Sequence, residues 1–140
     1  MKSFVMLCFL SFFLPAKTTG QNQTLTVVIR NIKNGKGTVA AAIYRSGEEF
    51  MKKTLQSISA PSRKGEVQLV FENIPAGEYA ISVMHDSNKN GVLDTNSMGI
   101  PKEGFGFSND AMATFGPPGF DKAKFNVPGE KDLIITLKYY

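Results

Sequence analysis

The chain has 140 residues, a length that suits a single domain. Its formal net charge is +4, from 16 Lys and Arg against 12 Asp and Glu. Without residues 1–20, which hold two lysines and no acid, the net charge falls to +2, too small a basic balance to predict nucleic-acid binding. The only cysteine, Cys8, lies in the same N-terminal segment, so the remainder has neither disulfides nor thiol chemistry.

Residues 1–20 have the pattern of a secretory signal peptide. Lys2 precedes an apolar run over 4–14, and Thr18 and Gly20 are small residues suited to a cleavage site. The run is shorter than the roughly 20 apolar residues that a membrane span needs. We therefore expect residues 21–140 to form one exported domain, periplasmic or extracellular, with no membrane span after cleavage.

The rest of the chain predicts short strands separated by turns, because apolar and polar residues alternate in runs of about six. The strands are expected at 25–30, 38–44, 55–60, 66–71, 78–84 and 122–127, with a last strand that carries Leu133, Ile135 and Leu137. The third and sixth of these have the weaker pattern. Asn34-Gly35 is a hairpin signal between the first two strands. Ser46 and Glu49 have the spacing of a capping box, which predicts a short helix after the second strand.

This pattern predicts an all-β fold, a single antiparallel β-sandwich of about seven strands, immunoglobulin-like or transthyretin-like, with one short helix. One segment does not fit the pattern of strands. Residues 95–120 are rich in glycine and phenylalanine and show no sustained period. Loops of this length are uncommon and are usually functional or disordered, and its aromatic content argues against disorder. We expect an ordered loop that its own aromatic side chains hold in place.

The polar residues that follow the fifth strand have the spacing of a calcium loop. Asp86, Asn88 and Asn90 match the first, third and fifth ligand positions, Val92 would offer its backbone carbonyl, and Asp94 takes the ninth position. Gly91 permits the sharp turn at the sixth position. The twelfth position, which is Glu in an EF-hand, is Ser97, and a strand rather than a helix leads into the loop.

A bidentate carboxylate would therefore come from elsewhere, and Glu103 is the nearest candidate. Two carboxylates with two amides predict weak calcium binding, in the roughly 10⁻⁴ to 10⁻³ M range of extracellular modules. The same residues also suit a purely polar turn, in which Asp and Asn side chains cap their own backbone. The sequence supports both interpretations equally.

Two other groups of residues allow different functions. His85 is the only histidine and continues the core-facing phase of its strand, so it either braces the loop or serves as the base of a hydrolase. The phenylalanines within 99–120 either pack over the end of the sandwich or form a surface for a carbohydrate or lipid. No serine sits in a nucleophile elbow, and the histidine is alone, which favours a non-catalytic module.

Several short motifs, in order, resemble domain-of-unknown-function family 2141, a group of small exported bacterial proteins. They are Gly77-x-Tyr79, His85-Asp86-x-Asn88-x-Asn90-Gly91, Leu93-Asp94-Thr95-Asn96, Gly99-Ile100-Pro101 and Gly104-Phe105-Gly106-Phe107-Ser108-Asn109. The similarity runs from about Leu25 to Leu137. It implies a bacterial cell-envelope context and a cell-envelope protein or glycan as partner. It implies no activity and no catalytic residues, because the family has no assigned activity.

Overall fold

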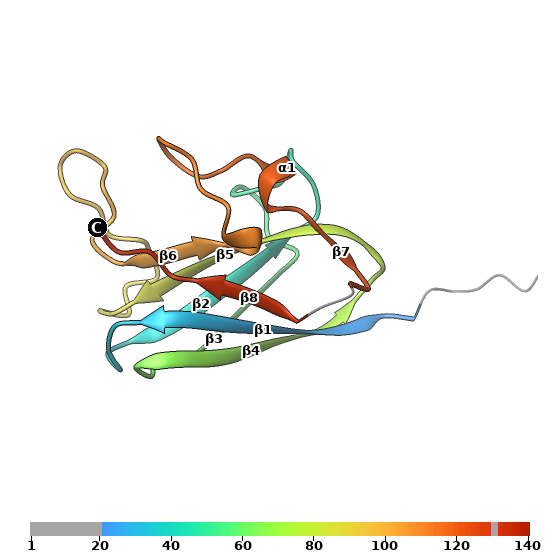
Figure 1. Ribbon diagram of the computed structural model, residues 1–140, viewed down its shortest axis with the longest axis horizontal. Helices are drawn as coiled ribbons and strands as arrows, with labels where there is room; N and C mark the ends of the chain where they lie inside the picture. Colours follow the sequence, from blue (N-terminus) through green and yellow to red (C-terminus); the bar gives the residue numbers. More distant parts are fainter. Residues whose placement is uncertain (1–20, 130–131) are drawn as a thin grey trace, which may run out of the picture.

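The computed structural model describes residues 21–129 and 132–140, which form a β-sandwich of two sheets (Figure 1). One sheet has the strand order β4-β1-β8, and the other has the order β3-β2-β5-β6, with β7 also paired to β5. The strands are β1 (Gln23–Ile32), β2 (Thr38–Tyr44), β3 (Gln56–Pro61), β4 (Gly65–Ile74), β5 (Gly77–Asp86), β6 (Gly104–Phe107), β7 (Phe125–Val127) and β8 (Leu133–Thr136). The predicted all-β sandwich is confirmed, whereas the predicted signal peptide lies outside the described residues.

The core follows from the alternation in the sequence. Every second side chain of β1, β4 and β5 turns inward, so residues such as Ile29, Phe71 and Ile81 are fully buried between the sheets. Burial of this apolar surface is the main term that stabilises a domain of this size.

The chain bends at residues 35–37, after Asn34, but the predicted hairpin is wrong. β1 pairs with β4 and β8, and β2 pairs with β3 and β5, so the segment between β1 and β2 crosses from one sheet to the other. The Asn34 side chain accepts a hydrogen bond from the Lys36 N–H at 2.9 Å and shapes this crossing. Local turn chemistry does not specify whether the strands on either side pair with each other or face each other across the core.

The predicted helix after β2 is a set of hydrogen-bonded turns over 47–52. The Glu49 N–H donates to Ser46 Oγ at 3.4 Å, as the capping box predicts, and the Phe50 N–H donates to the Ser46 carbonyl. Met51 then takes a φ of 62°, which ends the helical geometry. The short α-helix is α1 (Phe120–Ala123), at the start of the segment predicted as a weak strand at 122–127. Only the second half of that segment is strand.

The segment 95–120 is not a loop throughout, because it contains β6 and the 3-10 turn η1 (Ser108–Asp110). β6 has no apolar alternation because Gly104 and Gly106 occupy its inward positions. A Cβ at Gly104 would overlap the Tyr139 ring, and one at Gly106 would lie 2.9 Å from Ile135 Cγ2. The inner face of β6 is therefore bare backbone, covered by the C-terminal residues.

Aromatic side chains hold this segment, as predicted. Phe107 and Phe120 pack edge-on against Phe50, with ring centroids 6.2 Å and 6.0 Å away, and Tyr44 joins the same cluster at 5.3 Å. Phe115 is the exception, with 91% of its surface exposed.

The C-terminal residues join the two sheets. β8 runs parallel to β1, the one departure from antiparallel pairing among the named strands of the described chain. Beyond it, Lys138 and Phe105 exchange backbone hydrogen bonds of 2.8 Å and 3.0 Å, which link the β8 segment to β6. Among the described residues, no helix has the length and apolar character to cross a membrane.

Candidate metal-binding loop

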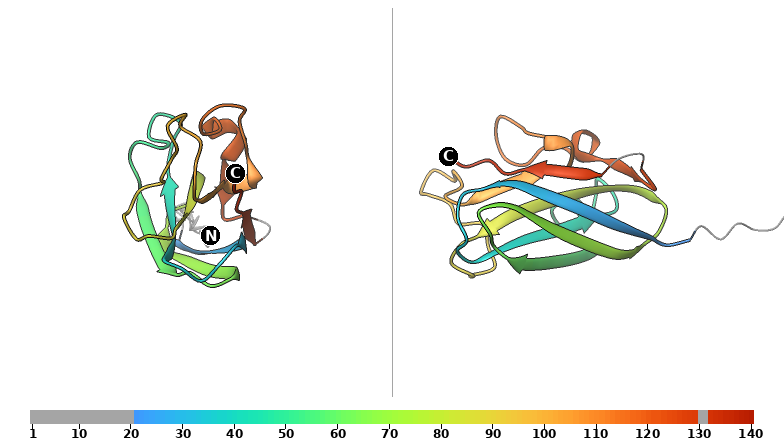
Figure 2. Two further views of the ribbon diagram at one scale, coloured as in Figure 1. Left: turned by 90° about the vertical axis from the view of Figure 1, so that its left-hand side faces the viewer. Right: turned by 60° about the horizontal axis from the view of Figure 1, so that its bottom comes forward.

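The loop that was predicted from its polar spacing connects β5 to β6, from Ser87 to Glu103, at one end of the sandwich. Figure 2 shows it beside the C-terminus, at the end where the β1–β2 and β3–β4 connections also lie. We call this the loop end of the molecule. It comprises residues 30–38, 61–66, 86–104 and 137–140.

Asp86 is the buried base of the loop. It is 4% exposed, and its carboxylate accepts hydrogen bonds from the Asn90 N–H at 3.1 Å and the Gly91 N–H at 2.8 Å. The chain curls around this carboxylate because Lys89 and Gly91 take φ values of 59° and 79°, in the left-handed region. A carboxylate that accepts N–H bonds from a curled backbone fixes the loop in one shape.

The next three predicted side chains converge. The Asp94 carboxylate accepts hydrogen bonds from Asn88 Nδ2 at 2.6 Å and from Asn90 Nδ2 at 2.8 Å and 3.0 Å. The amide oxygens turn the other way: Asn88 Oδ1 accepts from the Asn90 N–H at 3.2 Å, and Asn90 Oδ1 accepts from the Val92 N–H at 3.1 Å. The third, fifth and ninth positions of the calcium spacing are therefore gathered within hydrogen-bond distance.

Glu103 lies at the foot of the loop rather than over it. It is 6% exposed, and one carboxylate oxygen accepts from Ser87 N–H and Oγ at 2.9 Å and 3.0 Å. The other oxygen accepts from the Asp94 N–H at 3.1 Å. Glu103 thus ties the first residue of the loop to the ninth ligand position. Val92 presents its side chain to solvent, with 57% exposed.

The chemistry of this loop suits a hard cation. Within residues 21–129 and 132–140, no three His, Cys, Asp or Glu side chains are grouped to hold a metal ion, so a site here depends on amide and carbonyl oxygens as well. Calcium takes six to eight such oxygens, whereas zinc takes nitrogen and sulfur. Each oxygen that accepts one N–H keeps a second lone pair.

His85 is buried beneath the loop, with 1% exposed. Its Nε2 lies 2.8 Å from the Lys36 carbonyl oxygen, which can only accept, so Nε2 carries the proton. Tyr139 Oη then donates to Nδ1 at 2.9 Å. Ser62 Oγ lies 3.0 Å from Nε2 but donates to the Asn34 carbonyl at 2.8 Å. Because Nε2 carries the proton, it does not accept a proton from Ser62. The ring instead braces three segments of the loop end, through its contacts with Lys36, Ser62 and Tyr139.

Tyr139 makes the stability of this brace depend on pH. Burial raises the pKa of Tyr139 above its ordinary value of 10.0, and the hydrogen bond from the Lys33 N–H, which lowers the pKa, has the smaller effect. Because the folded protein favours the neutral phenol, its contribution to stability is complete below pH 10 and is lost as pH rises through the folded-state pKa. We expect the stability difference between wild type and Tyr139→Phe to stay constant below pH 10 and to shrink as the pH rises above 10. Urea titrations at several pH values measure it, and a difference that stays constant at high pH as well would contradict this account.

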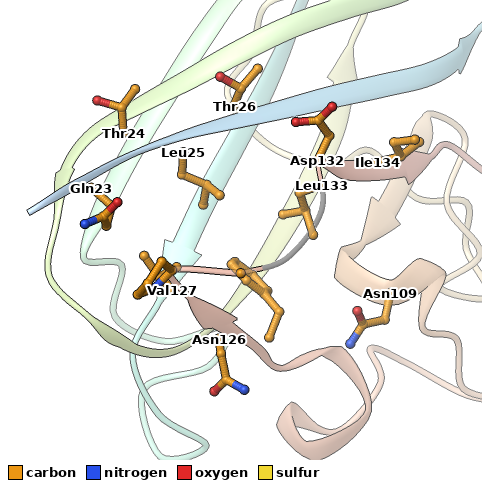
Figure 3. Close-up of a pocket in the computed structure, with 13 residues that line it drawn as sticks. Gln23, Thr24, Leu25, Thr26, Asn109, Asn126, Val127, Asp132, Leu133 and Ile134 are labelled. Atoms are coloured by element: carbon orange, nitrogen blue, oxygen red, sulfur yellow. The ribbon is translucent and has the colours of Figure 1, made fainter.

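A concave region of the surface lies away from the loop. A groove of about 1220 Å³ is bounded by the start of β1, by β7 and by the start of β8 (Figure 3). Leu25 and Leu133 point into it, and Asn109, Asn126 and Asp132 lie around it. Phe115 does not line this groove. Among the phenylalanines of 99–120 it is the exposed ring, whereas Phe105 and Phe120 are half-buried and Phe107 is buried.

Sequence reasoning found the loop but missed the residues that support it. Ser87, Ser62 and Tyr139 each contact a predicted site residue, yet their spacing carries no motif. The close approach of Gly37 to the backbone of Asp86 and Ser87 is also visible only in the structure.

A model of the family described as "Uncharacterized protein conserved in bacteria (DUF2141)" matches residues 27–136. That span runs from β1 to β8 and includes the whole loop. No curated protein and no solved structure matches the chain.

Proposed function

We propose that this chain, which belongs to the DUF2141 family, is an exported, non-catalytic module whose 86–94 loop binds calcium and is stabilised by it. The observation that carries the proposal is the convergence of Asn88, Asn90 and Asp94 above the buried carboxylate of Asp86. These side chains stand at the spacing that a calcium loop uses. The bracing role of His85 supports the non-catalytic part of the proposal.

The carboxylates of the loop favour a cation. Asp86, Asp94 and Glu103 are joined through short hydrogen bonds, and none of the three makes an ion pair with a described Lys or Arg. The amide groups of Asn88 and Asn90 donate to Asp94 and partly offset its charge. Calcium would replace these N–H donors and draw the amide oxygens and the Val92 carbonyl toward itself.

Glu103 has a different place in this proposal from the loop ligands. Its two oxygens already accept hydrogen bonds from Ser87 and Asp94, so it acts first by holding the loop closed. Magnesium should stabilise the loop less than calcium, because it requires tighter octahedral geometry and loses water reluctantly.

We expect calcium to raise the melting temperature of residues 21–140. At about 10 mM, which is a hundredfold excess for a dissociation constant of about 10⁻⁴ M, the gain is about 2.7 kcal/mol. For a domain of this length that corresponds to roughly 10 °C. Melting curves in calcium, in magnesium at equal ionic strength and in EDTA measure the effect.

Asp94→Asn tests the site, since it removes one carboxylate from a half-buried position and keeps its shape. We expect it to abolish most of the calcium shift. Asp121→Asn is the matched control, because Asp121 lies on α1 with 90% of its side chain exposed. Identical melting curves in calcium and EDTA would show that the loop is a polar turn held by its own hydrogen bonds. Equal shifts in wild type and Asp94→Asn would place the ion elsewhere.

A further inference from the structure

The charges of the described chain are unevenly placed. The loop end holds eight Lys and Arg and four Asp and Glu, a net charge of +4. The remaining described residues hold five Lys and Arg and seven Asp and Glu, a net charge of −2. The sequence hides this asymmetry, because the loop end is assembled from four separate segments. One end of the molecule is therefore basic although the domain as a whole is close to neutral.

Most of these cations are available to a partner. Of the eight Lys and Arg side chains of the loop end, all of which lie in the described part of the chain, only Arg30 makes an ion pair, with Glu66 at 3.0 Å. Lys33 lies over the Tyr139 ring at 4.4 Å, while Lys36, Lys89 and Lys102 are exposed. The three loop carboxylates, by contrast, are tied to backbone and amide N–H groups. Six of the eight cations are lysines, and they outnumber the four carboxylates of this end.

A hairpin projects from the same end, and we call residues 94–102 the arm. The Lys102 N–H donates to the Asp94 carbonyl at 2.8 Å, and the Asn96 N–H donates to the Ile100 carbonyl at 2.9 Å. Asn96 Oδ1 accepts from the Met98 and Ile100 N–H groups at 2.9 Å and 3.0 Å. Figure 1 shows the arm extending beyond the sheets, beside the C-terminus.

The tip of the arm is apolar. Met98 is 78% exposed and Ile100 is 40% exposed, and Val92, in the preceding loop, is also exposed. The backbone and Asn96 hold the shape of the arm, so these side chains are not needed to fold it. Exposed apolar side chains on a projecting turn, next to unpaired lysines, match what an interfacial lipid-binding segment requires.

We propose that the loop end docks on an anionic lipid surface, with Met98 and Ile100 entering the headgroup region and the surrounding lysines facing the phosphates. Charge complementarity identifies the lipid as anionic. The apolar tip favours a bilayer over a nucleic acid, because a phosphate backbone offers no apolar layer to bury it. This docking is peripheral and does not depend on bound calcium.

The test is vesicle sedimentation of residues 21–140 in EDTA, with phosphatidylcholine vesicles that contain about 30% phosphatidylglycerol and with phosphatidylcholine alone. We expect binding only to the anionic vesicles, weakened by salt. Lys89→Glu with Lys102→Glu should lower the partition coefficient by at least about 25-fold, at about fivefold per lysine. Met98→Ser with Ile100→Ser should lower it by at least about tenfold.

Controls come from the opposite end. Lys122→Glu on α1 and Met51→Ser in the turn after β2 change an exposed cation and an exposed methionine there, and both should bind as wild type does. Circular dichroism and melting curves confirm that each variant is folded. Absence of binding to the anionic vesicles would overturn the proposal. So would an effect of the lysine variant without any effect of the apolar variant, because that result describes adsorption to any polyanion.

Discussion

Gly37→Ala is expected to destabilise the protein by about 2–5 kcal/mol. Gly37 has a φ of 72°, and a Cβ there would overlap the Asp86 carbonyl oxygen and lie 2.6 Å from the Ser87 Cα. A left-handed conformation costs an alanine about 1–2 kcal/mol. The clashing atoms belong to the backbone of Asp86 and Ser87, which cannot rotate away as a side chain can. Overpacking therefore adds about 1–3 kcal/mol.

Gly35→Ala is the matched control for this prediction. It lies in the same crossing segment, has no positive φ, and its added Cβ would meet only the Ser62 carbonyl oxygen at 3.6 Å. Urea unfolding of both variants measures the difference. Because the clash pushes on the base of the loop, Gly37→Ala should also weaken any calcium shift. A Gly37→Ala variant within about 0.5 kcal/mol of wild type would mean that the crossing segment is not pressed against the loop.

Glu103→Ala is expected to cost about 2–4 kcal/mol in the absence of calcium. The substitution removes the acceptor for two backbone N–H groups, those of Ser87 and Asp94. A buried donor left without a partner costs about 1–3 kcal/mol, and these two are half-buried, so water offsets part of the loss.

Two comparisons separate this bracing role from metal ligation. Glu72→Ala removes an exposed carboxylate from β4 and should change stability by no more than about 0.5 kcal/mol. In Glu103→Ala, the amide hydrogens of Ser87 and Asp94 should exchange faster in EDTA, whereas a residue that acts only as a calcium ligand would leave that exchange unchanged. Wild-type stability of Glu103→Ala in EDTA would show that the loop does not need this brace.

The strands that the sequence predicted well are those whose inward positions carry large apolar side chains, as in β1 and β4. β6 escaped prediction because its inward positions are Gly104 and Gly106, and the residues that make glycine necessary there, Tyr139 and Ile135, are about 30 residues away in the chain. The crossing at Asn34-Gly35 was misread as a hairpin for a related reason. Turn residues report local geometry, whereas sheet partners are decided by burial across the core.

The candidate loop was predictable up to the point where contacts leave it. Asp86, Asn88, Asn90 and Asp94 form hydrogen bonds within a span of nine residues, and a spacing rule describes them completely. Glu103 was found as a nearby acid, but its partners Ser87 and the Asp94 N–H were not, because they depend on where β6 begins. The brace around His85 joins residues from four parts of the chain and leaves no pattern in any one of them.

The parallel pairing of β1 with β8 determines when the fold can be completed. β1 pairs with β4, whose residues follow their partners by 33 to 51 positions, but the other edge of β1 stays open until Leu133–Thr136 arrives beside Val27–Arg30. Until then the chain exposes an unpaired apolar strand, which is a template for association with other chains. Closing a loop of about 100 residues is also slow compared with forming hairpins. A chain emerging from a ribosome or a translocation pore would therefore remain open and vulnerable to aggregation until nearly all of it had passed through, and its folding rate should be limited by this closure.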